Sequence, residues 1–193
     1  MKMNKQIILA GSLAIAMMFS ACSGQPEVEK LPERGQCLIE NKVAPSWVCN
    51  QDIGYKDQLK DLGIAPYRGS GEFGFARREA MANGRSNLAQ QIQTEVKDKV
   101  ATFMEKTGLG ERATIDKVTT QVSKQVARVS MTNSHQLEFW DSGTSLFILV
   151  GIPKKDVNSK IGASVRTSLK NDDALWQQYK AKNSLDGLDK EFE

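Results

Sequence analysis

The chain has 193 residues, of which 40% are hydrophobic and 25% are charged, so it is long enough to build the core of one ordinary domain. Its 26 basic residues exceed its 23 acidic residues by three, and Lys2 and Lys5 supply two of that excess. Basic and acidic residues alternate along the chain without a basic stripe between aromatic residues, which argues against a nucleic-acid partner.

The first residues have the pattern of a lipoprotein signal peptide. Two lysines precede an apolar run at residues 7–19, and Ser20-Ala21-Cys22 is a small-small-Cys cleavage site. The apolar run has about 13 residues, whereas a membrane-spanning helix needs roughly 20. We therefore predict a signal peptide at residues 1–21 and lipid attachment at Cys22, which would anchor the mature chain to a membrane.

A polar segment follows the predicted anchor. Residues 22–36 contain two prolines and little that could be buried, which predicts a flexible tether. Ser23 stands where an aspartate would favour retention in the inner membrane. We therefore expect the lipid to lie in the outer membrane and the body of the protein in the periplasm.

Two cysteines, Cys37 and Cys49, remain in the predicted mature chain, and thiols in an oxidising periplasm most often pair as a disulfide. The only histidine is His135 and there is no C-x-x-C motif, so we expect no metal site and no cofactor. No activating base is evident near either thiol, which argues against a catalytic cysteine. Trp47 follows an extended Ala-Pro step and is expected to be buried in the domain.

Hydrophobic spacing predicts the next elements in chain order. A glycine-rich strand is expected at residues 67–75, followed by a long amphipathic helix at 75–107 that Gly108-Leu109-Gly110 ends. A second helix is expected at 114–133. The helical positions expected to be apolar in the first helix are Met81, Leu88, Ile92, Val96, Val100 and Phe103, and in the second Ile115, Val118, Val122, Val126 and Val129.

The sequence of the second half of the chain predicts a hairpin and further helices. Strands are expected at residues 136–140 and 145–152, and the second is apolar enough to lie at the centre of the sheet. Pro153 is expected to open a helix that buries Val157, Ile161, Val165 and Leu169. A further helix is expected at 174–182, capped by Asn171-Asp172.

The order strand, helix, helix, strand, strand, helix predicts an α+β fold, with a small mixed sheet covered by helices on one face. We place this domain at residues 37–170 and a C-terminal helical extension at 171–193. The extension has more apolar surface than a short tail needs, so it either docks on its own domain or forms an interaction surface for a neighbouring subunit. Its apolar residues are Leu175, Trp176, Tyr179, Leu185, Leu188 and Phe192.

Two patterns could indicate a ligand. Residues 69–74 match G-x-G-x-x-G, but a proline lies in the preceding segment and the acid about 20 residues on, Glu95, falls within a helix, which argues against a dinucleotide site. Arg77, Arg78 and Arg85 lie in the first turns of the long helix. They either form an anion site or are solvated and paired with Glu72 or Glu79.

Ser134, His135 and Glu138 contain the residue types of a hydrolytic triad. However, the chain has no G-x-S-x-G nucleophile elbow and no glycine-rich oxyanion loop. We therefore predict that the protein has no catalytic residues and is not an enzyme.

Three segments, taken in their order and spacing, carry a resemblance. Residues 44–48 (APSWV), 76–93 (ARREAMANGRSNLAQQIQ) and 145–157 (SLFILVGIPKKDV), following a lipid-anchor cysteine, resemble the twenty-kilodalton outer-membrane lipoprotein family. That family includes surface antigens of unknown biochemistry and lipoproteins of the flagellar basal disk. The resemblance covers about residues 44–170, and it brings no catalytic residues. Cys37, Cys49 and the extension after Leu169 depart from the family pattern.

The resemblance implies a non-enzymatic structural or assembly role in the envelope, through self-association or contact with envelope or flagellar proteins. The alternative is a periplasmic binding module that holds a small or lipidic ligand between the long helix and the sheet. Phe73, Ile92 and Phe147 would then line an apolar pocket.

Overall fold

The computed structural model describes residues 36–51, 54–182, 188, 191 and 192. The predicted signal peptide and all but the last residue of the predicted tether lie outside these residues. Every described helix and strand belongs to one unit, residues 32–193.

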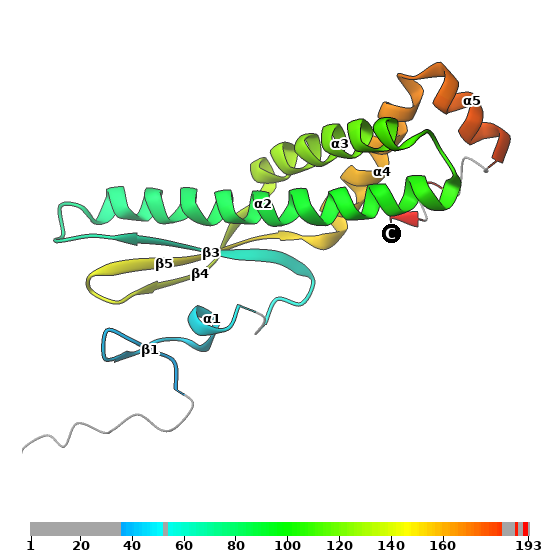
Figure 1. Ribbon diagram of the computed structural model, residues 1–193. Coiled ribbons are helices and arrows are strands. Elements are labelled where there is room, and N and C mark those ends of the chain that lie inside the picture. The colour runs from blue at the N-terminus through cyan, green and yellow to red at the C-terminus, as the bar shows by residue number, and fades with distance from the viewer. Residues whose placement is uncertain (1–35, 52–53, 183–187, 189–190, 193) are drawn as a thin grey trace, which may run out of the picture. The chain divides into compact units, whose positions relative to one another are not determined.

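The fold is α+β, as predicted, and is built around a three-stranded sheet (Figure 1). The strands lie in the order β3-β5-β4 and both pairings are antiparallel, so the sheet is not the mixed one expected. The sheet strands are β3 (Gln58–Pro66), β4 (His135–Asp141) and β5 (Ser145–Pro153). The long helices are α2 (Phe73–Thr107), α3 (Arg112–Asn133), α4 (Lys154–Lys170) and α5 (Asp173–Lys182).

Strand β5 is the centre of the fold, as its apolar run predicted. Every residue from Leu146 to Ile152 is buried. Because side chains alternate across a strand, β5 supplies two separate cores. Leu146, Ile148, Val150 and Ile152 face the helices, whereas Phe147 and Leu149 face the opposite side of the sheet.

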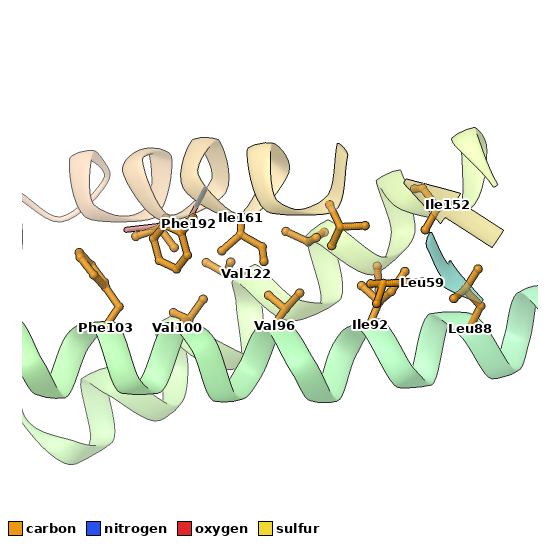
Figure 2. Close-up of a cluster of buried hydrophobic side chains, with 14 of the residues drawn as sticks. Leu59, Leu88, Ile92, Val96, Val100, Phe103, Val122, Ile152, Ile161 and Phe192 are labelled. Atoms are coloured by element: carbon orange, nitrogen blue, oxygen red, sulfur yellow. The ribbon is translucent and has the colours of Figure 1, made fainter. Parts of the chain in front are cut away.

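Helix α2 buries a stripe of residues that recur every four positions. The stripe begins with Ala76, Ala80 and Gly84 and continues with larger side chains, namely Leu88, Ile92, Val96, Val100 and Met104. A step of four residues advances about 40° beyond a full turn of an α-helix, so the stripe winds around α2. The helix therefore begins on the sheet with its small residues, continues with Leu88 and Ile92 beside Leu59 and Ile152 of the sheet, and packs larger residues against α3 and α4 farther along (Figure 2). Figure 2 shows Val96, Val100 and Phe103 of α2 pointing toward Ile161 of α4, with Phe192 beside them.

The small end of this stripe lets α2 lie directly on the backbone of β3. A β-carbon built on Gly63 of β3 would overlap the carbonyl oxygen of Ala80 and the amide nitrogen of Gly84. Two asparagines of α2 add hydrogen bonds to the outer edge of β3: Asn83 Nδ2 donates to the Ile64 carbonyl oxygen and Asn87 Nδ2 to that of Leu62, each at 2.9 Å. These side chains occupy carbonyl groups that an edge strand would otherwise present to another chain.

A disulfide-closed segment covers the other face of the sheet. Cys37 and Cys49 are bonded, with their α-carbons 5.8 Å apart, and enclose β1 (Leu38–Ile39), β2 (Lys42–Val43) and most of α1 (Ser46–Cys49). Trp47 is buried, as predicted, and packs with Val48 in the cluster that contains Phe147 and Leu149. A disulfide across a loop of this length contributes roughly 3 kcal/mol in the chain-entropy model. Trp47 and the disulfide together hold the segment on the sheet.

The turn of this segment also contacts the β4–β5 turn. Glu40 and Asn41 have positive φ angles of 52° and 61°, and they connect β1 to β2. The Lys42 ammonium donates to the Ser142 carbonyl oxygen, and the hydroxyl of Thr144 donates to the Glu40 carboxylate. These polar contacts hold the β1–β2 hairpin beside the β4–β5 turn at the end of the sheet.

The predicted helices are confirmed to within about two residues, including the left-handed Gly108 that ends α2. The strand predicted at residues 67–75 is wrong: β3 ends at Pro66, and residues 67–72 lead into α2. The sequence of β3 contains Lys60, Asp61 and Gly63 and therefore lacks a strong strand pattern. In the second helix Val129 is 44% exposed, and Ser130 is buried in its place.

The apolar residues of the C-terminal extension are mostly buried in the chain's own core. Leu175, Tyr179, Leu188 and Phe192 are at most 6% exposed and belong to the main core cluster. Trp176 is half-buried against that cluster, and Leu185 lies outside the described residues. Asp172 Oδ1 accepts a hydrogen bond from the Leu175 amide at 3.1 Å, which is the predicted cap of α5. The extension therefore docks on its own domain, and these buried side chains do not form an exposed interaction surface.

The contact at Gly63 gives the first prediction. Replacing Gly63 by Ala should lower the free energy of unfolding by roughly 2 to 4 kcal/mol, because backbone atoms of α2 cannot move away as a flexible side chain could. The measurement is equilibrium chemical denaturation. Gly74→Ala is the matched control, since its β-carbon meets no atom closer than 4.0 Å. A Gly63→Ala variant as stable as the control would contradict the close contact.

Candidate functional site

A groove lined by three arginines is the strongest candidate site. It has a volume of about 600 Å³ and is open to solvent. Its lining residues come from α2 and from the start of β4, and they are Arg77, Arg78, Met81, Ala82, Arg85 and Gln136. We call this feature the arginine groove.

The fold places the arginine groove through the packing of α2. Arg77, Met81 and Arg85 are spaced by four residues and follow one side of the helix, with Arg78 and Ala82 next to them. This side is adjacent to the buried stripe that begins at Ala76 and contacts the sheet. Because α2 packs closely on β3, the arginines lie beside the residues at the start of β4.

Neutral partners hold two of the three guanidinium groups. Arg77 Nη2 donates to Gln136 Oε1 at 3.3 Å, and its central carbon lies 5.8 Å from the ring centre of Phe139. Arg85 donates from Nε to Ser134 Oγ at 3.1 Å and from Nη2 to the Ser134 carbonyl oxygen at 3.3 Å. These contacts orient both side chains without neutralising their charge.

No carboxylate of the described residues pairs with these arginines. The ion pairs found within residues 36–51, 54–182, 188, 191 and 192 are Lys99–Glu95 and Lys106–Glu191. Glu72, an expected partner, instead accepts a hydrogen bond from the Arg68 amide at 2.8 Å. The expected pairing of the arginines with Glu72 or Glu79 is therefore not observed, and no carboxylate among the described residues balances the three positive charges of the groove.

Two carboxylates of β4 bind tyrosine hydroxyls instead of arginines. The hydroxyl of Tyr55 donates to Glu138 Oε1 at 2.6 Å, and the hydroxyl of Tyr67 donates to Asp141 Oδ1 at 2.8 Å. Each hydrogen bond raises the pKa of its tyrosine, because the phenol must keep its proton to donate to the carboxylate. Both pairs connect the segments that flank β3 to β4.

Asp61 of β3 is a partly buried carboxyl with a perturbed pKa. Burial raises the pKa of Asp61, and a hydrogen bond from the Leu62 amide at 2.7 Å lowers it to a smaller extent. Perturbed carboxyl groups often mark functional sites, but Asp61 is not among the lining residues of the arginine groove. Its observed contact is a local one that satisfies an outward amide of the edge strand.

The residues of the candidate triad do not form one. The Ser134 hydroxyl donates to the Met131 carbonyl oxygen at 2.8 Å and accepts from Arg85, while Glu138 binds Tyr55. His135 is exposed at the start of β4. The G-x-G-x-x-G segment also lacks its required context, because β3 pairs antiparallel with β5 and does not belong to a parallel βαβ unit.

The apolar pocket predicted between Phe73, Ile92 and Phe147 does not exist as such. Ile92 faces the helical core, whereas Phe147 lies in the cluster on the opposite face of the sheet. Among the residues with described positions, no group of three or more His, Cys, Asp or Glu side chains could hold a metal ion. Within the same residues, no helix is both long and apolar enough to cross a membrane.

Sequence reasoning identified the three arginines but left their role open. It missed Gln136, and it considered Ser134 only as a member of a hydrolytic triad and not as a partner of Arg85. One signal in the sequence favours the unpaired arrangement: no arginine of the groove has an acidic residue three or four positions away on the helix. Those are the spacings at which helical side chains meet. Glu72 and Glu79 stand at other spacings from all three.

Comparison with known proteins adds one finding. A family model described as LPP20 lipoprotein matches residues 45–152, which span α1 to β5 and include all of the arginine groove. No curated protein matches the chain.

The raised pKa of Asp61 gives the second prediction. Because the folded pKa exceeds the ordinary value of 3.8, the neutral carboxyl is favoured in the fold, and stability is lost as the pH rises through the folded pKa. Asp61→Asn, which keeps an oxygen to accept from Leu62, should therefore raise the free energy of unfolding at neutral pH.

The gain of Asp61→Asn should shrink as the pH falls toward about 3, where the wild-type carboxyl is protonated in both states. Denaturation of both proteins across this pH range measures it. Asp116→Asn, on the exposed side of α3, is the control and should change stability by less than about 0.5 kcal/mol. A gain that did not depend on pH would argue against burial as the cause.

Proposed function

The chain belongs to the LPP20 lipoprotein family and is a lipoprotein of the cell envelope, and on this basis we propose that it is anchored in the outer membrane through Cys22 and has a non-enzymatic structural or assembly role. The family match is the observation that carries the proposal. The body, on this proposal, faces the periplasm.

The sequence before the described residues supports the anchor. Ser20-Ala21-Cys22 ends an apolar run of the length and flanks of a signal peptide, and a lipidated cysteine would be the first residue of the mature chain. The 15 residues from Cys22 to Gln36 could span at most about 50 Å when fully extended. The domain would therefore stay close to the membrane surface.

The family and the positions of the polar residues support a non-enzymatic role. The LPP20 lipoprotein family is not a known enzyme family. The hydroxyl of Ser134 is engaged by Arg85 and by the Met131 carbonyl, and Glu138 binds Tyr55. These contacts support a structural use of the residue types that could otherwise suggest hydrolysis.

We extend the proposal to the partners. The protein would associate with copies of itself or with envelope proteins, including those of the flagellar basal disk, as the resemblance of its motifs implies. The buried C-terminal residues do not supply this contact, so it would involve other surfaces.

A binding role is the second candidate, and the arginine groove favours it. A hollow of about 600 Å³ is within the range of small-molecule sites. The sequence suggested a small or lipidic ligand in an apolar pocket, whereas the three charges of this groove favour an anionic ligand.

The anchor gives the third prediction. Intact-mass analysis of the native protein should show a chain that begins at Cys22 and carries acyl chains, and Cys22→Ser should abolish acylation and release the protein from the outer-membrane fraction. Cys37→Ser is the control, because that cysteine is in the disulfide and should leave acylation unchanged. A native product that is unacylated and starts at Met1 would overturn the proposed function.

The assembly role gives the fourth prediction. Sedimentation of the lipidated protein in detergent should show species larger than one chain, and a deletion strain should show a defect in envelope integrity or in motility. Imaging of a tagged copy separates these, since a motor component would gather at the flagellated site. A monomer in detergent, together with normal envelope integrity and motility in the deletion strain, would contradict the assembly role.

A further inference from the structure

We propose that the arginine groove is a binding site for phosphate groups, the chemistry shared by the headgroups of envelope lipids and by soluble phosphate esters. The proposal deepens the proposed function and rests on it, because the lipid anchor is what keeps the groove near a phosphate-rich surface.

The first argument is the unbalanced charge. Arg77, Arg78 and Arg85 line one hollow, and within the described parts of the chain none of them lies within ion-pair distance of a carboxylate. The carboxylates of β4 are occupied by Tyr55 and Tyr67. Three like charges around one hollow repel each other, and an anion placed among them removes that repulsion.

The second argument is the set of remaining donors. A guanidinium group has five N–H donors, and the observed hydrogen bonds use one from Arg77 and two from Arg85. Gln136 and Ser134 fix the two side chains, so less conformational freedom is lost when a ligand binds. The remaining donors are therefore available in a partly ordered arrangement.

The third argument separates phosphate from carboxylate. A carboxylate offers two oxygens and one charge. A phosphate monoester offers three terminal oxygens and up to two charges, and a phosphodiester headgroup offers one charge with two terminal and two ester oxygens. Arginine forks suit this chemistry better than lysine, because they can donate two parallel hydrogen bonds. A site with three arginines is better matched by the phosphate.

The fourth argument concerns the rest of the ligand. Met81 and Ala82 form an apolar part of the groove wall between the charged residues. A hollow of about 600 Å³ is larger than one phosphate ion requires, so it can also hold the organic part of an ester. We therefore expect glycerol phosphate to bind more tightly than inorganic phosphate.

The experiment uses the full lipidated protein. In a detergent that lacks phosphate groups, calorimetric titration with glycerol 3-phosphate and with inorganic phosphate measures binding of the soluble compounds. In detergent, native mass spectrometry measures binding of phosphatidylglycerol, with diacylglycerol as the lipid that lacks phosphate.

The variants isolate the groove. Arg77→Gln combined with Arg78→Gln removes two charges and leaves Arg85 on Ser134, which protects the fold. Lys117→Gln combined with Lys124→Gln removes the same charge from exposed positions of α3. Arg77→Lys combined with Arg78→Lys keeps the charge and removes the forks, and thermal unfolding confirms that each variant is folded.

Binding should be saturable, and the Arg77→Gln, Arg78→Gln protein should bind at least about tenfold more weakly, while the α3 control binds as the wild type does. The Arg-to-Lys protein should fall between them. Binding in the glycerol phosphate arm identifies soluble esters as ligands, and binding in the phosphatidylglycerol arm alone identifies lipids; both outcomes support the site.

No binding in either arm, or equal weakening by the groove and control variants, would overturn the site. This failure is distinct from failure of the proposed function. An acylated protein whose groove does not bind phosphate still has its anchor, whereas an unacylated native protein overturns the anchor whatever the groove binds.

Discussion

The contact between the backbones of α2 and β3 is the constraint on which the rest of the structure depends. Gly63 and Gly84 leave no β-carbon between helix and strand, and Ala80 adds only a methyl group. The backbones of α2 and β3 therefore lie close enough for dispersion forces to act directly between them. The hydrogen bonds from Asn83 and Asn87 to β3 stabilise the same contact. Because this contact fixes one end of α2, the helix direction over the sheet is set.

The buried stripe that winds around α2 connects this contact to the rest of the core, because the same helix also packs against α3 and α4. One helix of 35 residues, about 52 Å long, begins on the sheet with small residues and extends beyond it to pack large residues against α3 and α4. The same orientation brings Arg77 and Arg85 to Gln136 and Ser134, at the junction of α3 and β4. The other face of the sheet is covered by the disulfide-closed segment, which packs Trp47 against it, and not by a long helix. The structural core and the arginine groove thus share one helix.

The parts that the sequence predicted well are those with strong local patterns. Apolar residues at helical spacing located α2, α3 and α4, and the run from Leu146 to Ile152 identified the central strand. Strand β3 was missed because its glycine and charged residues are poor strand formers, and pairing with β5 outweighs their local preference. The three arginines were recognised, but their expected pairing with Glu72 or Glu79 ignored the helical spacing at which side chains meet.

By itself, the sequence determined the α+β class, the order of most elements and the lipoprotein pattern, since each depends on neighbours within a few helical turns or on a short motif. Only the tertiary structure decided that the C-terminal residues Leu175 and Phe192 are buried and that the sheet has a second core around Trp47. It also decided the groove, in which Arg77 meets Gln136 across 59 positions of the chain. Such contacts join residues that no local periodicity relates, so they arise only when the helix is packed on the sheet.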